Sequence, residues 1–211
     1  MIRQERQTFL LSGKNYSYAM QVNRAGLLQH LYYGGKIAPE DLAFLAGTQG
    51  KSAAPDPDDF NIAKTMDRMP AECGSFGRGD FRPATVIADR EDGASMSDFY
   101  FVSSRISRGA PALAGMPHVR KADETLTVTL RDALSDVEID LVYVVSDDSD
   151  VLVRHTVIRN AGQDAVRLSR AFSFCFDLPD VRAPYAALRL PGTWGNERSP
   201  VTTTLAEGTL R

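Results

Sequence analysis

The segment VEIDLVYVV, residues 137–145, decides the fold class. In its first half, apolar residues alternate with the acidic Glu138 and Asp140, so the two kinds of side chain fall on opposite faces of an extended strand. In its second half, both faces are apolar. The pattern predicts a β-strand that is covered on one side along its length and on both sides near its end.

Other β-favouring runs surround this segment and are joined by polar turns. Residues 151–159 and 166–176 follow it, and residues 8–11, 16–22 and 27–33 form a predicted antiparallel meander near the N-terminus. Long strands joined by polar turns are typical of a large β-sandwich. The predicted fold class is therefore all-β, a large antiparallel β-sandwich with little helix.

One short helix and one long loop are expected among the strands. Residues 39–45 begin with a proline followed by acidic residues, which favours one or two helical turns. Residues 47–70 are polar and irregular, with Pro and Asp at their centre. A loop of this length in a compact domain is usually functional or disordered.

Length and charge restrict the number of domains and the kinds of partner. The 211 residues suffice for one sizeable core, so a single domain over residues 1–211 is expected. The 24 basic and 27 acidic residues are interspersed, which predicts no nucleic-acid and no membrane partner.

No apolar run of signal-peptide length follows the N-terminus, which indicates a soluble, cytoplasmic protein. Residues 200–205 predict a strand, and the chain is expected to be truncated after it.

The residue types that build catalytic and metal sites do not cluster in the sequence. Cys73 and Cys175 lack CxxC spacing and are predicted to be free thiols. The histidines have no metal-site spacing, and structural roles are predicted for them. They are His30, His118 and His155. The acidic turn lacks the glycine and distal glutamate of an EF-hand and is predicted to be solvated. It contains Asp147, Asp148 and Asp150. No catalytic residue, metal or cofactor is predicted.

The stretch GRGDFRP, residues 77–83, is a dense polar motif that leads into a predicted strand over residues 83–88. Its glycines permit a tight turn, and the guanidinium of Arg82 suits either a carboxylate such as Asp80 or the hydroxyl groups of a sugar. Both alternatives remain open. The tripeptide RGD also occurs in adhesion ligands, but that role requires an extracellular protein. The lack of an apolar run of signal-peptide length after the N-terminus argues against secretion.

The stretch LPGTWGNER, residues 190–198, contains the single tryptophan. An exposed Trp194 would stack on the apolar face of a sugar, with Glu197 and Arg198 beside the sugar hydroxyls. A buried tryptophan that fixes a loop to a sheet is the alternative.

Taken in order, these segments resemble the N-terminal domain of glycoside hydrolase family 36, the retaining α-galactosidases. The strongest motifs are GDFR, residues 79–82, and Trp194 followed by Glu197 and Arg198. The resemblance extends over nearly the whole chain. Further matching segments are residues 16–20, 26–34, 72–82, 98–100, 115–117, 125–126, 130–132 and 170–173.

The resemblance implies a β-supersandwich that precedes a (β/α)₈ barrel, and the barrel carries both catalytic aspartates. One of these lies in a Lys-Trp-Asp segment, which this chain lacks, and no alternating βα pattern occurs. The barrel is therefore expected to be absent from residues 1–211. The segment alone is expected to be inactive.

The resemblance further implies a parent enzyme that hydrolyses terminal α-galactosyl residues of oligosaccharides. This segment would support the barrel, a homotetramer and the substrate entrance. In family tetramers a loop of this domain reaches the active site of a neighbouring subunit and contacts substrate. The corresponding loop is expected within residues 47–70. Asp56, Asp59 and Arg68 are guesses, made from polarity alone, at the residues that contact substrate there.

The candidates for substrate binding or subunit contact are Asp80, Arg82, Trp194, Glu197 and Arg198. The alternative function is a stand-alone carbohydrate-binding β-sandwich without hydrolase activity, which would use the three residues of the Trp194 motif.

Overall fold

The structure, a computed structural model, describes residues 1–47, 66, 69–77, 79–177 and 185–205. The chain divides into two compact units, Met1–Asp177 and Leu178–Arg211. The single domain expected over residues 1–211 stays a prediction. Asp56, Asp59 and Arg68, the guesses from polarity, lie outside the described residues.

The N-terminal residues form an antiparallel four-stranded sheet in the order β1-β2-β3-β4. Its strands are β1 (Ile2–Glu5), β2 (Thr8–Ser12), β3 (Tyr16–Val22) and β4 (Leu28–Gly35). The predicted meander is thus confirmed. β1 was not predicted, because Ile2 is its only buried residue and the strand is otherwise polar and exposed.

A second antiparallel sheet has the order β6-β7-β8-β9. Its strands are β6 (Phe99–Arg108), β7 (Glu124–Asp132), β8 (Val137–Val145) and β9 (Val153–Asn160). β8 is the strand predicted from the 137–145 pattern, and Val142 and Val144 on its second face are buried as expected. β6 was not predicted, because most of its side chains are partly or fully exposed and its apolar residues do not alternate.

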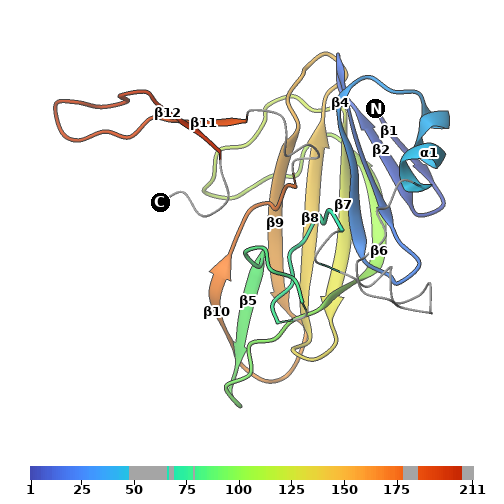
Figure 1. Cartoon of the computed structure of the whole chain (residues 1–211). Coiled ribbons are helices and arrows are strands. Elements are labelled where there is room, and N and C mark those ends of the chain that lie inside the picture. The colour runs from blue at the N-terminus through green and yellow to red at the C-terminus, as the bar shows by residue number, and fades with distance from the viewer. Residues whose placement is uncertain (48–65, 67–68, 78, 178–184, 206–211) are drawn as a thin grey trace. The chain divides into compact units, whose positions relative to one another are not determined.

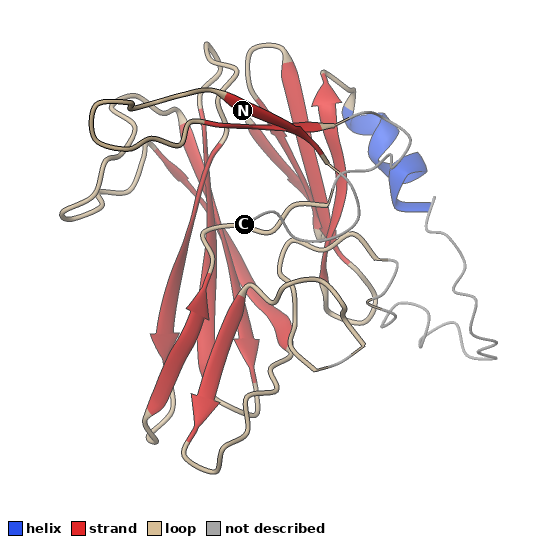
Figure 2. Ribbon diagram, turned by 60° about the vertical axis from the view of Figure 1, so that its left-hand side comes forward, coloured by secondary structure: helices blue, strands red, loops and turns tan. Residues whose placement is uncertain are grey.

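The two sheets pack face to face and enclose the main core (Figures 1 and 2). Phe9, Leu11 and Met20 of the first sheet are fully buried, and so are Leu126 and Ile139 of the second. The fold is a large antiparallel β-sandwich, so the predicted fold class is confirmed.

A two-stranded sheet pairs β5 (Val86–Arg90) with β10 (Val166–Ala171). β5 begins three residues later than predicted, since the prediction started at Pro83, which has no N–H for a ladder bond. β10 ends at Ala171 instead of residue 176. Residues 172–177 leave the strand and run beside β9, where the Thr156 hydroxyl donates to the Ser173 carbonyl at 3.0 Å.

The predicted helix is present as η1 (Pro39–Asp41) followed by α1 (Leu42–Gly47). The Asp41 carboxylate accepts the Ala38 N–H at 3.0 Å, which satisfies one of the free donors at the start of the helix. No helix within the described ranges has the length and apolar composition needed to cross a membrane.

The second unit contains a hairpin of β11 (Ala186–Arg189) and β12 (Val201–Thr204). β12 agrees with the strand predicted over residues 200–205, whereas β11 was not predicted. The loop between these strands carries the Trp194 motif.

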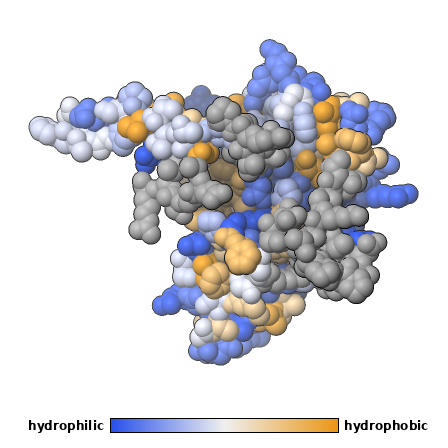
Figure 3. Space-filling model, in the orientation of Figure 1, coloured by the Kyte–Doolittle hydropathy of each residue, from blue (hydrophilic) through white to orange (hydrophobic). Residues whose placement is uncertain are grey.

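In the space-filling view, apolar residues reach the surface in separate patches among hydrophilic ones (Figure 3).

Candidate functional site

Glu72 lies fully buried between the two sheets. Its carboxylate accepts hydrogen bonds from the Tyr18 hydroxyl at 2.6 Å and the Tyr143 hydroxyl at 2.6 Å. The Nδ1 atom of His30 lies 2.8 Å from the same carboxylate, and an Nη1–H of Arg154 donates to it at 3.1 Å. Side chains from β3, β4, β8 and β9 therefore meet on one acid, and we name these five residues the Glu72 cluster.

The charges of the Glu72 cluster compensate one another. Burial opposes ionisation of Glu72, but the Arg154 guanidinium and the bond to His30 outweigh it and hold the pKa of the carboxyl below its ordinary value. Burial, together with the neighbouring Glu72 charge, raises the pKa of Tyr18, and burial also raises that of Tyr143. The acid is therefore ionised at neutral pH, and both tyrosines remain neutral donors.

In this arrangement Glu72 is not available to act on a substrate. Both carboxylate oxygens already accept bonds from the chain itself, and the side chain is not exposed. The geometry instead joins the sheets, because its donors come from strands on both sides of the sandwich. The role is structural.

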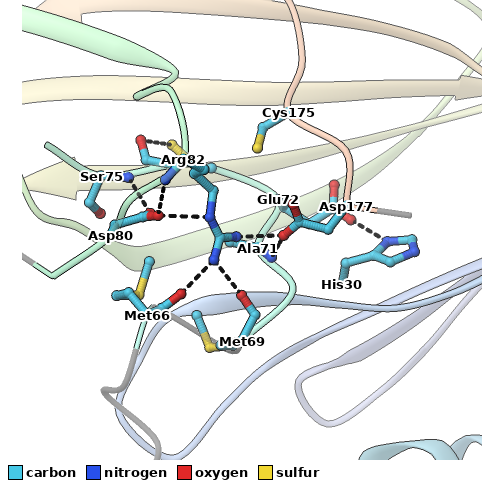
Figure 4. Close-up of polar contacts among 12 residues, drawn as sticks. His30, Met66, Met69, Ala71, Glu72, Ser75, Asp80, Arg82, Cys175 and Asp177 are labelled. Carbon is cyan, nitrogen blue, oxygen red and sulfur yellow. Dashed lines mark hydrogen bonds and ion pairs between the residues drawn. The ribbon is translucent and has the colours of Figure 1, made fainter. Parts of the chain in front are cut away.

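Arg82 and Asp80 form a second polar centre, in the turn before β5 (Figure 4). The Arg82 Nε lies 2.7 Å from the Asp80 carboxylate, and Nη1 donates to Asp177 at 2.5 Å. Its Nη2 donates to the backbone carbonyls of Met66 and Met69 at 2.5 and 2.7 Å. The guanidinium thus binds two carboxylates and two carbonyls of its own chain.

Asp80 shapes the backbone of this turn as well. Its carboxylate, which is fully buried, accepts the N–H of Ser75 at 3.0 Å and the N–H of Arg82 at 3.2 Å. Gly79 has φ 68°, a left-handed conformation that glycine adopts without strain. Of the two alternatives for Arg82, the structure contains the salt-bridged turn.

The turn buries its charged residues and exposes its aromatic one. Phe81 is 89% exposed, whereas the side chain of Arg82 is 15% exposed. The buried Asp80 carboxylate is not displayed as an adhesion ligand would require. Contact of Asp80 or Arg82 with a sugar or with a neighbouring subunit stays a prediction.

Trp194 lies in the loop of the β11–β12 hairpin and is 99% exposed. The loop is held by paired backbone bonds between Thr193 and Asn196, at 3.2 and 2.9 Å. The Glu197 carboxylate accepts the Gly195 N–H at 3.1 Å. The indole is therefore free to stack on a ligand, whereas the carboxylate of Glu197 already supports the loop. Sugar binding by Trp194, Glu197 and Arg198 stays a prediction.

Of the remaining residues singled out by sequence, three border the Glu72 cluster. His30 belongs to it, Cys73 directly follows Glu72 in the chain, and the backbone carbonyl of Cys175 accepts an Nη1–H of Arg154 at 2.8 Å. Cys73 and Cys175 are free thiols, as predicted. In the acidic turn, Asp148 pairs with Lys121 on the surface, and Asp150 accepts bonds from Asn15. Nowhere in the described part of the chain do three His, Cys, Asp or Glu side chains gather as a metal would require.

Sequence reasoning missed the Glu72 cluster, although one signal was available. Tyr18 and Tyr143 occupy apolar positions in predicted strands, and a buried tyrosine hydroxyl usually has a hydrogen-bond partner. That partner comes from residue 72, which is far from both tyrosines in the sequence. Only the packing of the sheets brings it between them.

The chain matches the family model described as the glycosyl hydrolase family 36 N-terminal domain over residues 26–211. It is 33% identical to alpha-galactosidase AgaA of Geobacillus stearothermophilus over 200 residues, which cover 92% of this chain and 27% of the relative. It is 32% identical to the bifunctional alpha-galactosidase/sucrose kinase AgaSK of Mediterraneibacter gnavus, over 97% of this chain and 22% of the relative.

Solved structures agree with the sequence relatives. The GH36 alpha-galactosidase AgaB of Geobacillus stearothermophilus has a TM-score of 0.85 at 29% identity, over 99% of this chain and 29% of that chain. The chain therefore spans less than a third of the length of the relatives that it matches. On these matches, the chain belongs to the N-terminal domain family of glycoside hydrolase family 36.

Proposed function

We propose that this chain is the N-terminal β-sandwich region of a retaining α-galactosidase. The whole protein would hydrolyse terminal α-galactosyl residues of oligosaccharides. The observation that carries the proposal is the family match over residues 26–211, together with relatives named as α-galactosidases. Variants of AgaA have been solved in complex with raffinose and with stachyose, so these sugars are the first substrates to test.

The role of the segment itself is architectural: it supports the catalytic barrel, a homotetramer and the substrate entrance of a cytoplasmic enzyme. The surroundings of two buried acids, Glu72 and Asp80, support this role. A retaining glycosidase needs two carboxyl groups about 5–5.5 Å apart that face the sugar. Glu72 and Asp80 are instead enclosed and bonded to donors of their own chain.

Activity measurements on two proteins test the proposal. The 211-residue chain should not turn over an aryl α-galactoside, whereas the whole protein of which it is the N-terminal part should do so at rates typical of enzymes. An aryl β-galactoside serves as the control substrate for both. Clear turnover by the 211-residue chain would refute the architectural role, and an inactive whole protein would refute the α-galactosidase assignment.

A second candidate function is an independent carbohydrate-binding module, which the exposed indole of Trp194 favours. Titration with raffinose should then change the tryptophan emission, and the single tryptophan makes the signal unambiguous. Sucrose, which lacks the α-galactosyl group, is the matched control. No response to millimolar raffinose would argue against an independent module.

A further inference from the structure

The loop between β11 and β12 is fixed in shape by contacts within itself. In addition to the bonds described above, the N–H of Ser199 donates to the Pro191 carbonyl at 2.9 Å, and its hydroxyl donates to the Asn196 side chain at 2.8 Å. The two limbs of the loop touch at Gly192, where a Cβ atom would lie only 2.7 Å from the Cα of Glu197. The loop is therefore a formed surface rather than a loose connection.

Trp194 and Gly195 occupy the tip of this loop, between the paired residues Thr193 and Asn196. Gly195 has φ 78°, a left-handed conformation that glycine adopts without strain. The turn leaves the indole of Trp194 99% exposed. An aromatic side chain on a formed loop loses little conformational freedom when it binds, so it suits a binding surface.

Arg198 is an exposed residue of the same loop, and its backbone is strained. Its φ is 58°, a left-handed conformation in which glycine or asparagine is usual. Within the described part of the chain, its guanidinium has neither an ion pair nor a hydrogen bond that would offset the strain. Residues held in such conformations are concentrated at functional sites. The loop therefore presents two side chains that no other part of the described chain uses, Trp194 and Arg198.

The ligand class follows from the groups that the loop presents. The Glu197 carboxylate already accepts the Gly195 N–H, which leaves an aromatic face and a fork of N–H donors. An indole stacks on the apolar face of a sugar ring, and a guanidinium fork matches two neighbouring oxygen acceptors. A pyranose has both features on one ring, a face of C–H groups and pairs of neighbouring hydroxyls.

Galactose offers this site a continuous apolar face. Its C4 hydroxyl is axial, so the hydrogens on C3, C4 and C5 lie on one side of the ring. In glucose the C4 hydroxyl is equatorial and interrupts that patch. We propose that Trp194 and Arg198 form a binding site for galactose that discriminates against glucose, its C4 epimer. This inference rests on the carbohydrate-binding function given above as the second candidate.

Titration of the 211-residue chain with methyl α-galactoside and with methyl α-glucoside tests the selectivity. The emission of the single tryptophan should change with millimolar galactoside and respond at least several-fold more weakly to the glucoside. Saturation-transfer NMR should find the strongest transfer at the C3, C4 and C5 hydrogens of the galactoside. Equal affinities would overturn the selectivity but leave carbohydrate binding standing, whereas no response to either sugar or to raffinose would refute both.

Two glycine variants test the role of the guanidinium. Arg198→Gly removes the fork and adopts φ 58° without strain, so the unfolding midpoint should not fall while affinity for the galactoside falls about tenfold. The matched control is Arg6→Gly, at an exposed residue with φ 52° in the turn between β1 and β2, and it should leave the affinity unchanged. Unchanged affinity of Arg198→Gly would overturn the site. Emission that depends on protein concentration without sugar would also overturn it, by assigning Trp194 to a contact between copies.

Discussion

The hydroxyl of Tyr143 in β8 donates a 2.6 Å hydrogen bond to Oε2 of Glu72, while the hydroxyl of Tyr18 in β3 donates one of equal length to Oε1. The two strands belong to opposite sheets. One buried carboxylate therefore connects the layers of the sandwich. Its charge is matched by Arg154, whose guanidinium also lies over the Tyr143 ring at 5.0 Å.

Glu72→Gln should destabilise the fold by about 3–5 kcal/mol, because it leaves the buried Arg154 without a counter-charge. The replacement has the same shape, so the loss reports on charge rather than packing. Urea unfolding of the purified chain measures it. The control is Asp148→Asn, which removes an exposed pair with Lys121 and should leave the midpoint unchanged. Equal midpoints for all three proteins would contradict the structural role of Glu72.

The acid limb of the stability profile should depend on Glu72. Its pKa is lower in the folded chain than its ordinary value of 4.5, so its stabilisation is complete above that pH. The stabilisation is lost as the pH falls toward the folded pKa, because the unfolded chain binds the proton more readily. Urea midpoints between pH 6 and pH 3 should therefore fall more steeply for the wild type than for Glu72→Gln. Parallel profiles would contradict the depressed pKa.

Arg82→Ala should destabilise the chain by about 3–5 kcal/mol, since the buried Asp80 carboxylate loses its counter-charge. Phe81→Ser at the adjacent position is the matched control. Its side chain is 89% exposed, so the unfolding midpoint should change little. Thermal unfolding, monitored by circular dichroism, measures the midpoints of both variants and of the wild type. A larger loss for Phe81→Ser than for Arg82→Ala would show that the turn is not held by its polar bonds.

Both thiols should react slowly with iodoacetamide in the folded chain. Burial raises the pKa of Cys73 to about 12 and also raises that of Cys175, so little thiolate is present at pH 8. Peptide mass spectrometry should find much faster alkylation of both in urea. Rapid alkylation of folded Cys73 would contradict its burial.

Trp194 should be fully accessible to iodide. The indole is 99% exposed and is the only one in the 211-residue chain, so quenching should approach that of free tryptophan in water. A Stern–Volmer titration measures this, with the chain in urea as the reference for full exposure. A much smaller slope in the folded chain would place the indole against protein.

The sequence by itself determined the fold class and the family. Alternation in residues 137–145 predicted β8, and the turn-separated runs near the N-terminus predicted β2, β3 and β4. These predictions rest on local periodicity, which is legible without knowledge of neighbours. β1 and β6 were missed because exposed outer strands have little apolar periodicity. β7 was also missed, although its buried and partly exposed residues alternate.

Tertiary structure alone decided what the polar residues do. The sequence left open whether Arg82 binds carboxylates or a sugar. In the folded chain the Asp177 carboxylate and the backbone carbonyls of Met66 and Met69 accept hydrogen bonds from its guanidinium. Glu72 likewise acquired its role from tyrosines 54 and 71 residues away. Hydrogen bonds act over a few ångströms in space, so residues far apart in sequence become partners only after the sheets have packed.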